Sequence, residues 1–188
     1  MRIIGGTARS IQLTVPSGIR PTTDAMRETL FNVIGDRVVG SRWLDLFAGS
    51  GSVGLEALSR GAAHCTFVDN RPQCLQAIRA NLERLGLGEA VRDGRAAVVR
   101  ADARRVLPRL AAQRQYDFAF VDPPYGLRGL ERVLDDLLNG RLGLAAGAVV
   151  VVQHSRGEES VKAFRPSREK VFGESVLAFF AEGDATCD

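Results

Sequence analysis

The sequence predicts one α/β domain in which a mostly parallel sheet is covered by helices on both faces. The chain has 188 residues, 45% apolar and 25% charged, a composition typical of a single globular core. Short apolar runs alternate along it with stretches in which apolar residues recur at helical spacing. The connections between these segments are short. Strand and helix repeated in this way predict parallel strands joined by helical crossovers.

The N-terminus is expected to form a small hairpin outside the sheet. The patches Ile3-Ile4 and Ile11-Gln12-Leu13 flank Gly5-Gly6, which indicates a β-hairpin. Residues 1–20 carry three arginines and no acidic residue, so we interpret them as a basic arm ahead of a domain spanning 21–188. Pro21 and the capping side chains that follow it then predict a helix over residues 27–34.

The rest of the chain supplies the sheet and its covering helices. Strands are predicted at residues 43–47, 65–69, 97–101, 118–121 and 148–153. Helices are predicted at residues 53–60, 73–85, 103–112 and 130–138. Two further strands, at 170–172 and 176–180, are expected to close the C-terminal edge, which makes seven in all.

A glycine-rich turn follows the first strand of this sheet. Residues 49–54 read Gly-Ser-Gly-Ser-Val-Gly, a pattern that lets backbone pass close to a ligand where a strand leads into a helix. Asp69 ends the second strand, 20 residues after Gly49, where a carboxylate can accept hydrogen bonds from both ribose hydroxyls. Together these features predict a ligand that contains a nucleoside.

Asp45 distinguishes two such ligands. Its carboxylate, four residues before Gly49, would repel a dinucleotide pyrophosphate but can hold the ammonium group of S-adenosylmethionine. Asp102 follows the third strand, where it can accept a hydrogen bond from an adenine amino group, cap the next helix, or do both.

The most informative residues are Asp122-Pro123-Pro124-Tyr125, directly after the fourth strand. Two consecutive prolines exclude helix and ladder hydrogen bonding, which makes this turn rigid. The Asp122 carboxylate and the Pro123 carbonyl can each accept a hydrogen from an exocyclic amino group, and the Tyr125 ring can stack on a base. The predicted chemistry is therefore transfer of a group to an amino nitrogen.

This tetrapeptide resembles the motif of amino-group methyltransferases that use S-adenosylmethionine. Together with the segments 2–6, 20–24, 27–32, 44–51 and 54–62, it makes the chain similar to the RsmD-type bacterial 16S rRNA (guanine-N2)-methyltransferase family. The resemblance implies a Rossmann-like class I methyltransferase fold with a seven-stranded sheet and an N-terminal β-hairpin extension. The chain also departs from the family pattern at three positions. Ala25 stands where an arginine is usual, and Ser10 and Gln12 stand where a glycine and a basic residue are common.

The resemblance implies the site residues as well. The catalytic residues would be Asp122, Pro123, Pro124 and Tyr125. The residues expected to hold the cofactor are Arg20, Thr22, Asp45, Phe47, Gly49, Ser50, Gly51, Asp69, Asn70, Asp102 and Ala103. The residues expected to contact RNA are Arg2, Arg9, Arg20 and Arg27.

The expected reaction is methyl transfer from S-adenosylmethionine, leaving S-adenosylhomocysteine, to the N2 of a specific guanine in 16S rRNA. The partner would be that rRNA or the small ribosomal particle. Two alternatives stay open: methylation of an adenine N6 in DNA or RNA, and a ribosome assembly factor that does not catalyse. The sequence shows no secretion signal, membrane span or metal-ligand cluster, so we expect a cytoplasmic monomer without a metal or an obligate protein partner.

Overall fold

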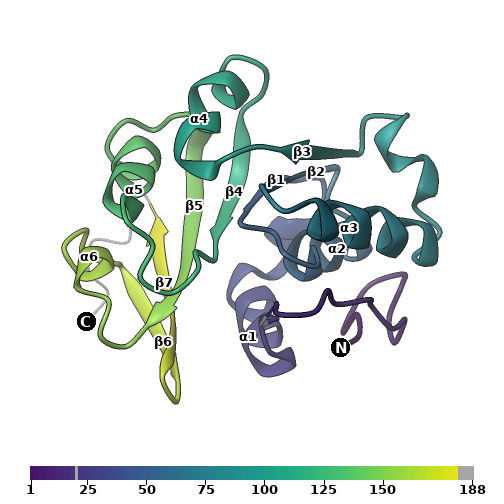
Figure 1. Ribbon diagram of the computed structural model, residues 1–188, viewed down its shortest axis with the longest axis horizontal. Helices are drawn as coiled ribbons and strands as arrows, with labels where there is room; N and C mark the ends of the chain where they lie inside the picture. Colours follow the sequence, from purple (N-terminus) through teal and green to yellow (C-terminus); the bar gives the residue numbers. More distant parts are fainter. Residues whose placement is uncertain (20, 182–188) are drawn as a thin grey trace.

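The computed structural model describes residues 1–19 and 21–181, and its central feature is one seven-stranded sheet (Figure 1). The order of the strands across the sheet is β3-β2-β1-β4-β5-β7-β6. The strands are β1 (Arg42–Leu46), β2 (His64–Asp69), β3 (Ala96–Arg100), β4 (Tyr116–Val121), β5 (Leu144–Ser155), β6 (Arg168–Phe172) and β7 (Ser175–Ala181). All seven predicted strands are confirmed, with ends that differ by a few residues.

The first five strands are parallel, whereas the C-terminal hairpin is antiparallel. β7 inserts between β5 and β6 and runs against both. The direction in which successive strands are added to the sheet reverses at β1, because β2 and β3 lie on one side of it and β4 and β5 on the other. Such a reversal leaves a crevice at the carboxyl ends of the central strands, where ligands bind in open α/β sheets.

Helices cover both faces of the sheet, as predicted. The helices are α1 (Asp24–Ile34), α2 (Ser52–Ser59), α3 (Pro72–Arg84), α4 (Ala103–Ala111), α5 (Leu130–Leu138) and α6 (Glu159–Lys162), with 3-10 turns η1 (Gly35–Val38) and η2 (Gly88–Val91). Apolar residues of α1, α2 and α3 share one core cluster with one face of the strands. Those of α4, α5 and α6 share a second cluster with the opposite face. The sequence analysis did not predict α6, η1 or η2.

The helix ends follow local chemistry. Thr23 caps α1, its Oγ1 accepting a hydrogen bond from the Met26 amide at 3.3 Å, so the helix begins three residues earlier than predicted. Pro72 opens α3, where a missing N–H costs nothing. None of the helices in residues 1–19 and 21–181 is long and apolar enough to cross a membrane.

The N-terminal segment folds back on itself but forms a smaller hairpin than predicted. Within residues 1–19, one isolated bridge pairs Arg2 with Gln12, and antiparallel backbone bonds such as the Ile3 amide to the Ile11 carbonyl at 3.0 Å support it. Gly6 lies at φ 75°, and a Cβ there would come within 1.9 Å of the Ser59 carbonyl oxygen. Only glycine therefore lets this turn pack against α2, and Ile3 is fully buried beneath it.

Candidate active site

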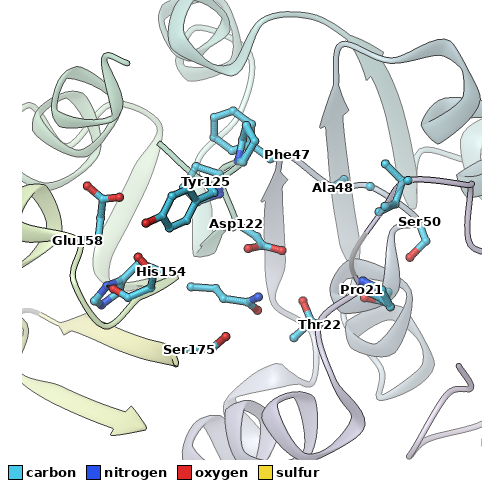
Figure 2. A pocket seen from close by; sticks show the side chains of 18 of the residues that line it. Pro21, Thr22, Phe47, Ala48, Ser50, Asp122, Tyr125, His154, Glu158 and Ser175 are labelled. Carbon is cyan, nitrogen blue, oxygen red and sulfur yellow. Dashed lines mark hydrogen bonds between the residues drawn. The ribbon is translucent and has the colours of Figure 1, made fainter. Parts of the chain in front are cut away.

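A cavity of about 670 Å³ opens at the carboxyl ends of β1, β4 and β5. Its size is within the range of about 300–1,000 Å³ found for small-molecule sites. In Figure 2, Asp122 and Thr22 extend toward the same space, with His154 and Ser175 on one side and Ser50 on the other. The lining residues are Gly18, Ile19, Pro21, Thr22, Phe47, Ala48, Gly49, Ser50, Ser52, Arg71, Asp122, Pro123, Pro124, Tyr125, Gln153, His154, Ser155, Gly157, Glu158, Glu174 and Ser175.

The glycine loop forms one wall through its backbone. Phe47 has a φ of 60°, a left-handed conformation that is uncommon outside glycine and tends to occur at functional sites. Gly51, at φ 77°, lies behind the wall, where a Cβ would come within 2.9 Å of Ile78. Phe47, Gly49 and Ser50 line the cavity as predicted, whereas Gly51 does not.

A buried asparagine connects this loop to the N-terminal segment. Asn81 of α3 is fully buried, and its Nδ2 donates to the carbonyls of Ser50 and Thr14, each at 3.0 Å. Its Oδ1 accepts from the Thr14 amide at 2.8 Å. The segment that leads into the cavity at Gly18 is thereby attached to the same helix as the glycine loop.

Asp69 supports the loop from behind and does not line the cavity. Its Oδ2 accepts from the Gly49 amide at 2.9 Å and from Arg71 Nη2 at 3.0 Å. Its Oδ1 accepts from the Arg71 amide at 2.9 Å and from Arg71 Nε at 3.0 Å. Burial acts to raise the pKa of Asp69, but the hydrogen bonds from Arg71 and Gly49 outweigh it and hold the pKa below its usual value. A ribose could reach this carboxylate only if Arg71 moved away.

Asp45 does not line the cavity, so its contact with an ammonium group, directly or through water, stays a prediction. It is 2% exposed, and its Oδ2 accepts a hydrogen bond from the Gly54 amide at 3.0 Å. Burial raises the pKa of this carboxyl well above its ordinary value, and the negative charges of Asp122 and Asp69 add to the shift. Asp45 therefore fixes the start of α2 to β1 and does not line the cavity.

Three other predicted cofactor residues lie outside the lining. Asp102 caps α4 by accepting from the Arg104 amide at 3.0 Å, and its carboxylate also pairs with the Arg104 guanidinium. The capping interpretation is thus confirmed, while contact with adenine stays a prediction. Ala103 is buried against the second core cluster, and Asn70 is exposed at the end of β2. The predicted residue Arg20 lies outside the described residues.

The four residues of the Asp-Pro-Pro-Tyr corner all line the cavity. The Asp122 amide donates to the Leu46 carbonyl at 3.3 Å, which ties the corner to the end of β1. Tyr125 is 91% exposed, so its ring is available at the mouth. The corner and the glycine loop therefore face one shared space, as the sequence predicted (Figure 2).

The sequence analysis missed a third wall, formed by the end of β5 and the β6–β7 turn. It consists of Gln153, His154, Ser155, Gly157, Glu158, Glu174 and Ser175. No motif marks these residues, although their position after an apolar run at the end of a predicted strand was a usable signal. Arg71 was missed as well.

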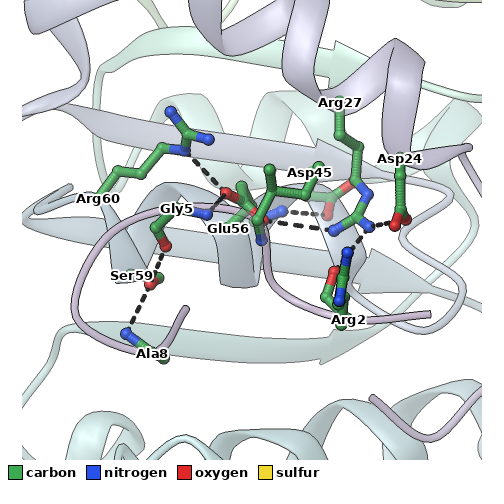
Figure 3. A network of polar contacts seen from close by, with 11 residues as sticks. Arg2, Gly5, Ala8, Asp24, Arg27, Asp45, Glu56, Ser59 and Arg60 are labelled. Atoms are coloured by element: carbon green, nitrogen blue, oxygen red, sulfur yellow. Dashed lines mark hydrogen bonds and ion pairs between the residues drawn. The ribbon is translucent and has the colours of Figure 1, made fainter. Parts of the chain in front are cut away.

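Arg27 was predicted to contact RNA, and the structure shows that this is wrong. Its side chain is fully buried between α1 and α2 (Figure 3). It donates to the Arg2 carbonyl at 2.8 Å and Asp24 at 2.6 Å, and lies 3.4 Å from Glu56. An arginine with no exposed surface cannot meet a phosphate. Arg2 and Arg9, by contrast, are exposed on the hairpin.

The strand order, with the antiparallel β7 and a glycine loop opposite an Asp-Pro-Pro-Tyr corner, defines a Rossmann-like class I methyltransferase fold. Residues 1–181 match the model of the family described as Conserved hypothetical protein 95. The chain is 38% identical to Ribosomal RNA small subunit methyltransferase D of Escherichia coli K12, over 100% of this chain and 94% of that protein. The chain therefore belongs to this family, the RsmD-type methyltransferases.

Solved structures agree with this assignment. A hypothetical protein of Thermus thermophilus superposes with a TM-score of 0.81 at 34% identity, over 96% of this chain and 98% of that one. An RNA methyltransferase of Salinibacter ruber, solved in complex with S-adenosyl-L-homocysteine, superposes with a TM-score of 0.63 over 90% and 97%. At 14% identity, this second likeness shows the fold alone.

Proposed function

We propose that this protein transfers a methyl group from S-adenosylmethionine to the exocyclic N2 of a specific guanine in 16S rRNA, of the guanine-966 type. The observation that carries the proposal is the Asp122–Tyr125 corner, which lines the same cavity as the glycine loop. Membership of the methyltransferase D family supports rRNA of the small subunit as the substrate.

The charges of the cavity fit this cofactor better than a dinucleotide. Among the described residues, the lining carries three carboxylates, on Asp122, Glu158 and Glu174. Arg71, the one arginine among the lining residues that the structure describes, is paired with Asp69. Such a lining suits a cationic sulfonium and disfavours a pyrophosphate. The cofactor would contact Thr22, Phe47, Gly49 and Ser50.

When bound, S-adenosylmethionine supplies an electrophilic methyl group. The task of the protein is then to position a weak nucleophile, because the lone pair of a guanine amino group is delocalised into the ring. The Asp122 carboxylate and the Pro123 carbonyl accept the two amino hydrogens, which directs the lone pair into the cavity. Tyr125 stacks on the base. The proton that the nitrogen loses on alkylation passes to Asp122 or to water, so no separate strong base is needed.

The direct test is the identity of the methylated nucleoside. Small-subunit particles and naked 16S rRNA, both from cells that lack the gene, are incubated with the protein and isotopically labelled S-adenosylmethionine, then digested for mass spectrometry. The expected product is labelled N2-methylguanosine. Labelled N6-methyladenosine would instead establish the adenine alternative. No product, together with no binding of S-adenosylhomocysteine by calorimetry, would favour the assembly factor.

A further inference from the structure

Gln153 occupies the position next to Asp122 on the neighbouring strand. β4 and β5 are parallel, and Val121 pairs in register with Val152, so Asp122 and Gln153 are the next residues of each strand. The preceding pair, Phe120 and Val151, belongs to one core cluster, and Val121 and Val152 belong to the other. Because side chains alternate between faces, Asp122 and Gln153 emerge on the same side of the sheet, and both line the cavity.

The amide oxygen of Gln153 is buried and has no hydrogen-bond partner among the described residues. Buried polar atoms in folded proteins are nearly always paired, so an unpaired one that belongs to a cavity wall indicates a ligand donor. Two other side-chain atoms in residues 1–19 and 21–181 are also buried and have no hydrogen-bond partner. Arg27 Nε lies in the polar cluster beneath the hairpin, and His154 Nε2 lies 4.0 Å from Glu169 Oε1. Neither residue shares the register position beside Asp122.

The amide of Gln153 matches the edge of guanine next to its amino group. Beside N2, guanine presents the N1–H donor and then the O6 acceptor, and a glutamine amide offers one acceptor and one donor. An adenine whose N6 lay at Asp122 would present N1 without a hydrogen, which leaves the amide oxygen unpaired. We propose that Gln153 is a specificity-determining residue that accepts from guanine N1–H through Oε1 and donates to O6 through Nε2. This inference rests on the proposed function.

The experiment compares two nucleobases that carry the same reacting amine. Small-subunit particles are reconstituted with 16S rRNA carrying either guanine or 2-aminopurine at the nucleotide that the wild-type protein methylates. 2-Aminopurine keeps the amino group at C2 but lacks both N1–H and O6. kcat/KM is measured on both for the wild type, Gln153→Ala and the isosteric Gln153→Glu. Gln113→Ala, at an exposed glutamine after α4, is the matched control.

The ratio of kcat/KM on guanine to kcat/KM on 2-aminopurine measures the preference of each variant for guanine. We expect the wild type and Gln113→Ala to prefer guanine, and Gln153→Ala to lower that preference by about tenfold or more while the rate on 2-aminopurine stays within about threefold. Gln153→Glu keeps the shape of the side chain but replaces the donor to O6 with an acceptor, so it should also lower the preference for guanine. This variant tests the role of Gln153 if the alanine variant does not fold. An equal loss on both bases would overturn the inference alone. No transfer to guanine by the wild type would overturn the proposed function with it.

Discussion

The carboxylate of Asp69 and the guanidinium of Arg71 form a bidentate ion pair, in which Nε donates to Oδ1 and Nη2 donates to Oδ2, each at 3.0 Å. Arg71 lines the cavity, whereas Asp69 lies behind it, 3% exposed. The arginine thus occupies the hydrogen-bonding positions of the carboxylate that the sequence assigned to a ribose. Binding of the cofactor at Asp69 therefore requires this ion pair to open.

The first prediction follows from that competition. Asp69→Ala should weaken the binding of S-adenosylhomocysteine by about tenfold or more, because it removes the acceptor for the ribose and the bond to the Gly49 amide. Arg71→Ala should bind at least as tightly as the wild type. Isothermal titration calorimetry measures both affinities. Weaker binding by Arg71→Ala would show that the arginine contacts the cofactor and that it does not compete with it.

The second prediction concerns pH. The pKa of Asp45 is raised in the folded protein, so its contribution to stability is present below the unfolded pKa of about 3.9 and is lost as pH rises through the folded value. Asn keeps an acceptor for the Gly54 amide without the buried charge. Asp45→Asn should therefore gain stability relative to the wild type as the pH is raised from about 4 to about 8, as measured by urea unfolding.

Asp117 supplies a control of opposite sign. Burial acts to raise the pKa of Asp117, but the hydrogen bonds from Arg42 outweigh it and lower the pKa. Its contribution is present above about pH 3.9 and is lost as pH falls through the lower folded value. Asp117→Asn should accordingly lose stability relative to the wild type at neutral pH and approach it in acid. If both variants shifted in the same direction, the assignment for Asp45 would be wrong.

The third prediction concerns Glu56, which holds the hairpin on α2 (Figure 3). Its buried carboxylate accepts from the amides of Ile4 and Gly5 at 2.8 and 2.7 Å and from Arg60 at 2.8 Å. Glu56→Ala leaves these donors and the Nη1 of the buried Arg27 without this acceptor, although Arg27 Nη2 keeps the Arg2 carbonyl and Asp24, so we expect a loss of about 3–5 kcal/mol in the free energy of unfolding.

Hydrogen exchange over residues 1–14 provides a second measurement, because the hairpin amides should lose protection in Glu56→Ala. The control is Glu89→Ala, whose ion pair with Arg92 is exposed on both sides. Removing that pair should cost less than about 1 kcal/mol. Equal losses in the two variants would contradict the role given to Glu56.

The fourth prediction separates the arginines by exposure. Arg2 and Arg9 are exposed on the hairpin, so replacing both with alanine should weaken RNA binding and lower the slope of log affinity against log salt by about 2. Filter binding at several salt concentrations measures this slope. Arg92→Ala, at an exposed arginine directly after η2, should change neither quantity. An unchanged slope in the double variant would remove the hairpin from the RNA interface.

The sequence predicted the fold well because most of the strands contain short apolar runs that alternate with stretches of helical spacing. It also predicted that the glycine loop and the Asp122 corner meet, since the carboxyl ends of parallel strands share an edge. It could not predict which charges are buried. Arg27 and Glu56 are 29 residues apart along the chain, and only the packing of α1 on α2 shows that they neutralise each other.

The same reason explains why the hydrogen-bond partners of Asp45 and Asp69 could not be predicted. Both were placed correctly at strand ends, but the sequence does not show which way a carboxylate turns there. Gly54 and Arg71 supply the donors that turn these two groups away from the cavity. Gln153 was missed for a different reason, because a single glutamine after an apolar run carries no motif. Its role emerges only from its register beside Asp122.

The most direct test of the account is the single-turnover rate of methyl transfer by Asp122→Ala, measured with saturating S-adenosylmethionine on small-subunit particles. We expect a rate lower by about two or more orders of magnitude, with the affinity for S-adenosylhomocysteine unchanged. Asp93→Ala, at an exposed aspartate, should keep the wild-type rate. A wild-type rate in Asp122→Ala would contradict the claim that this corner holds the reacting amino group.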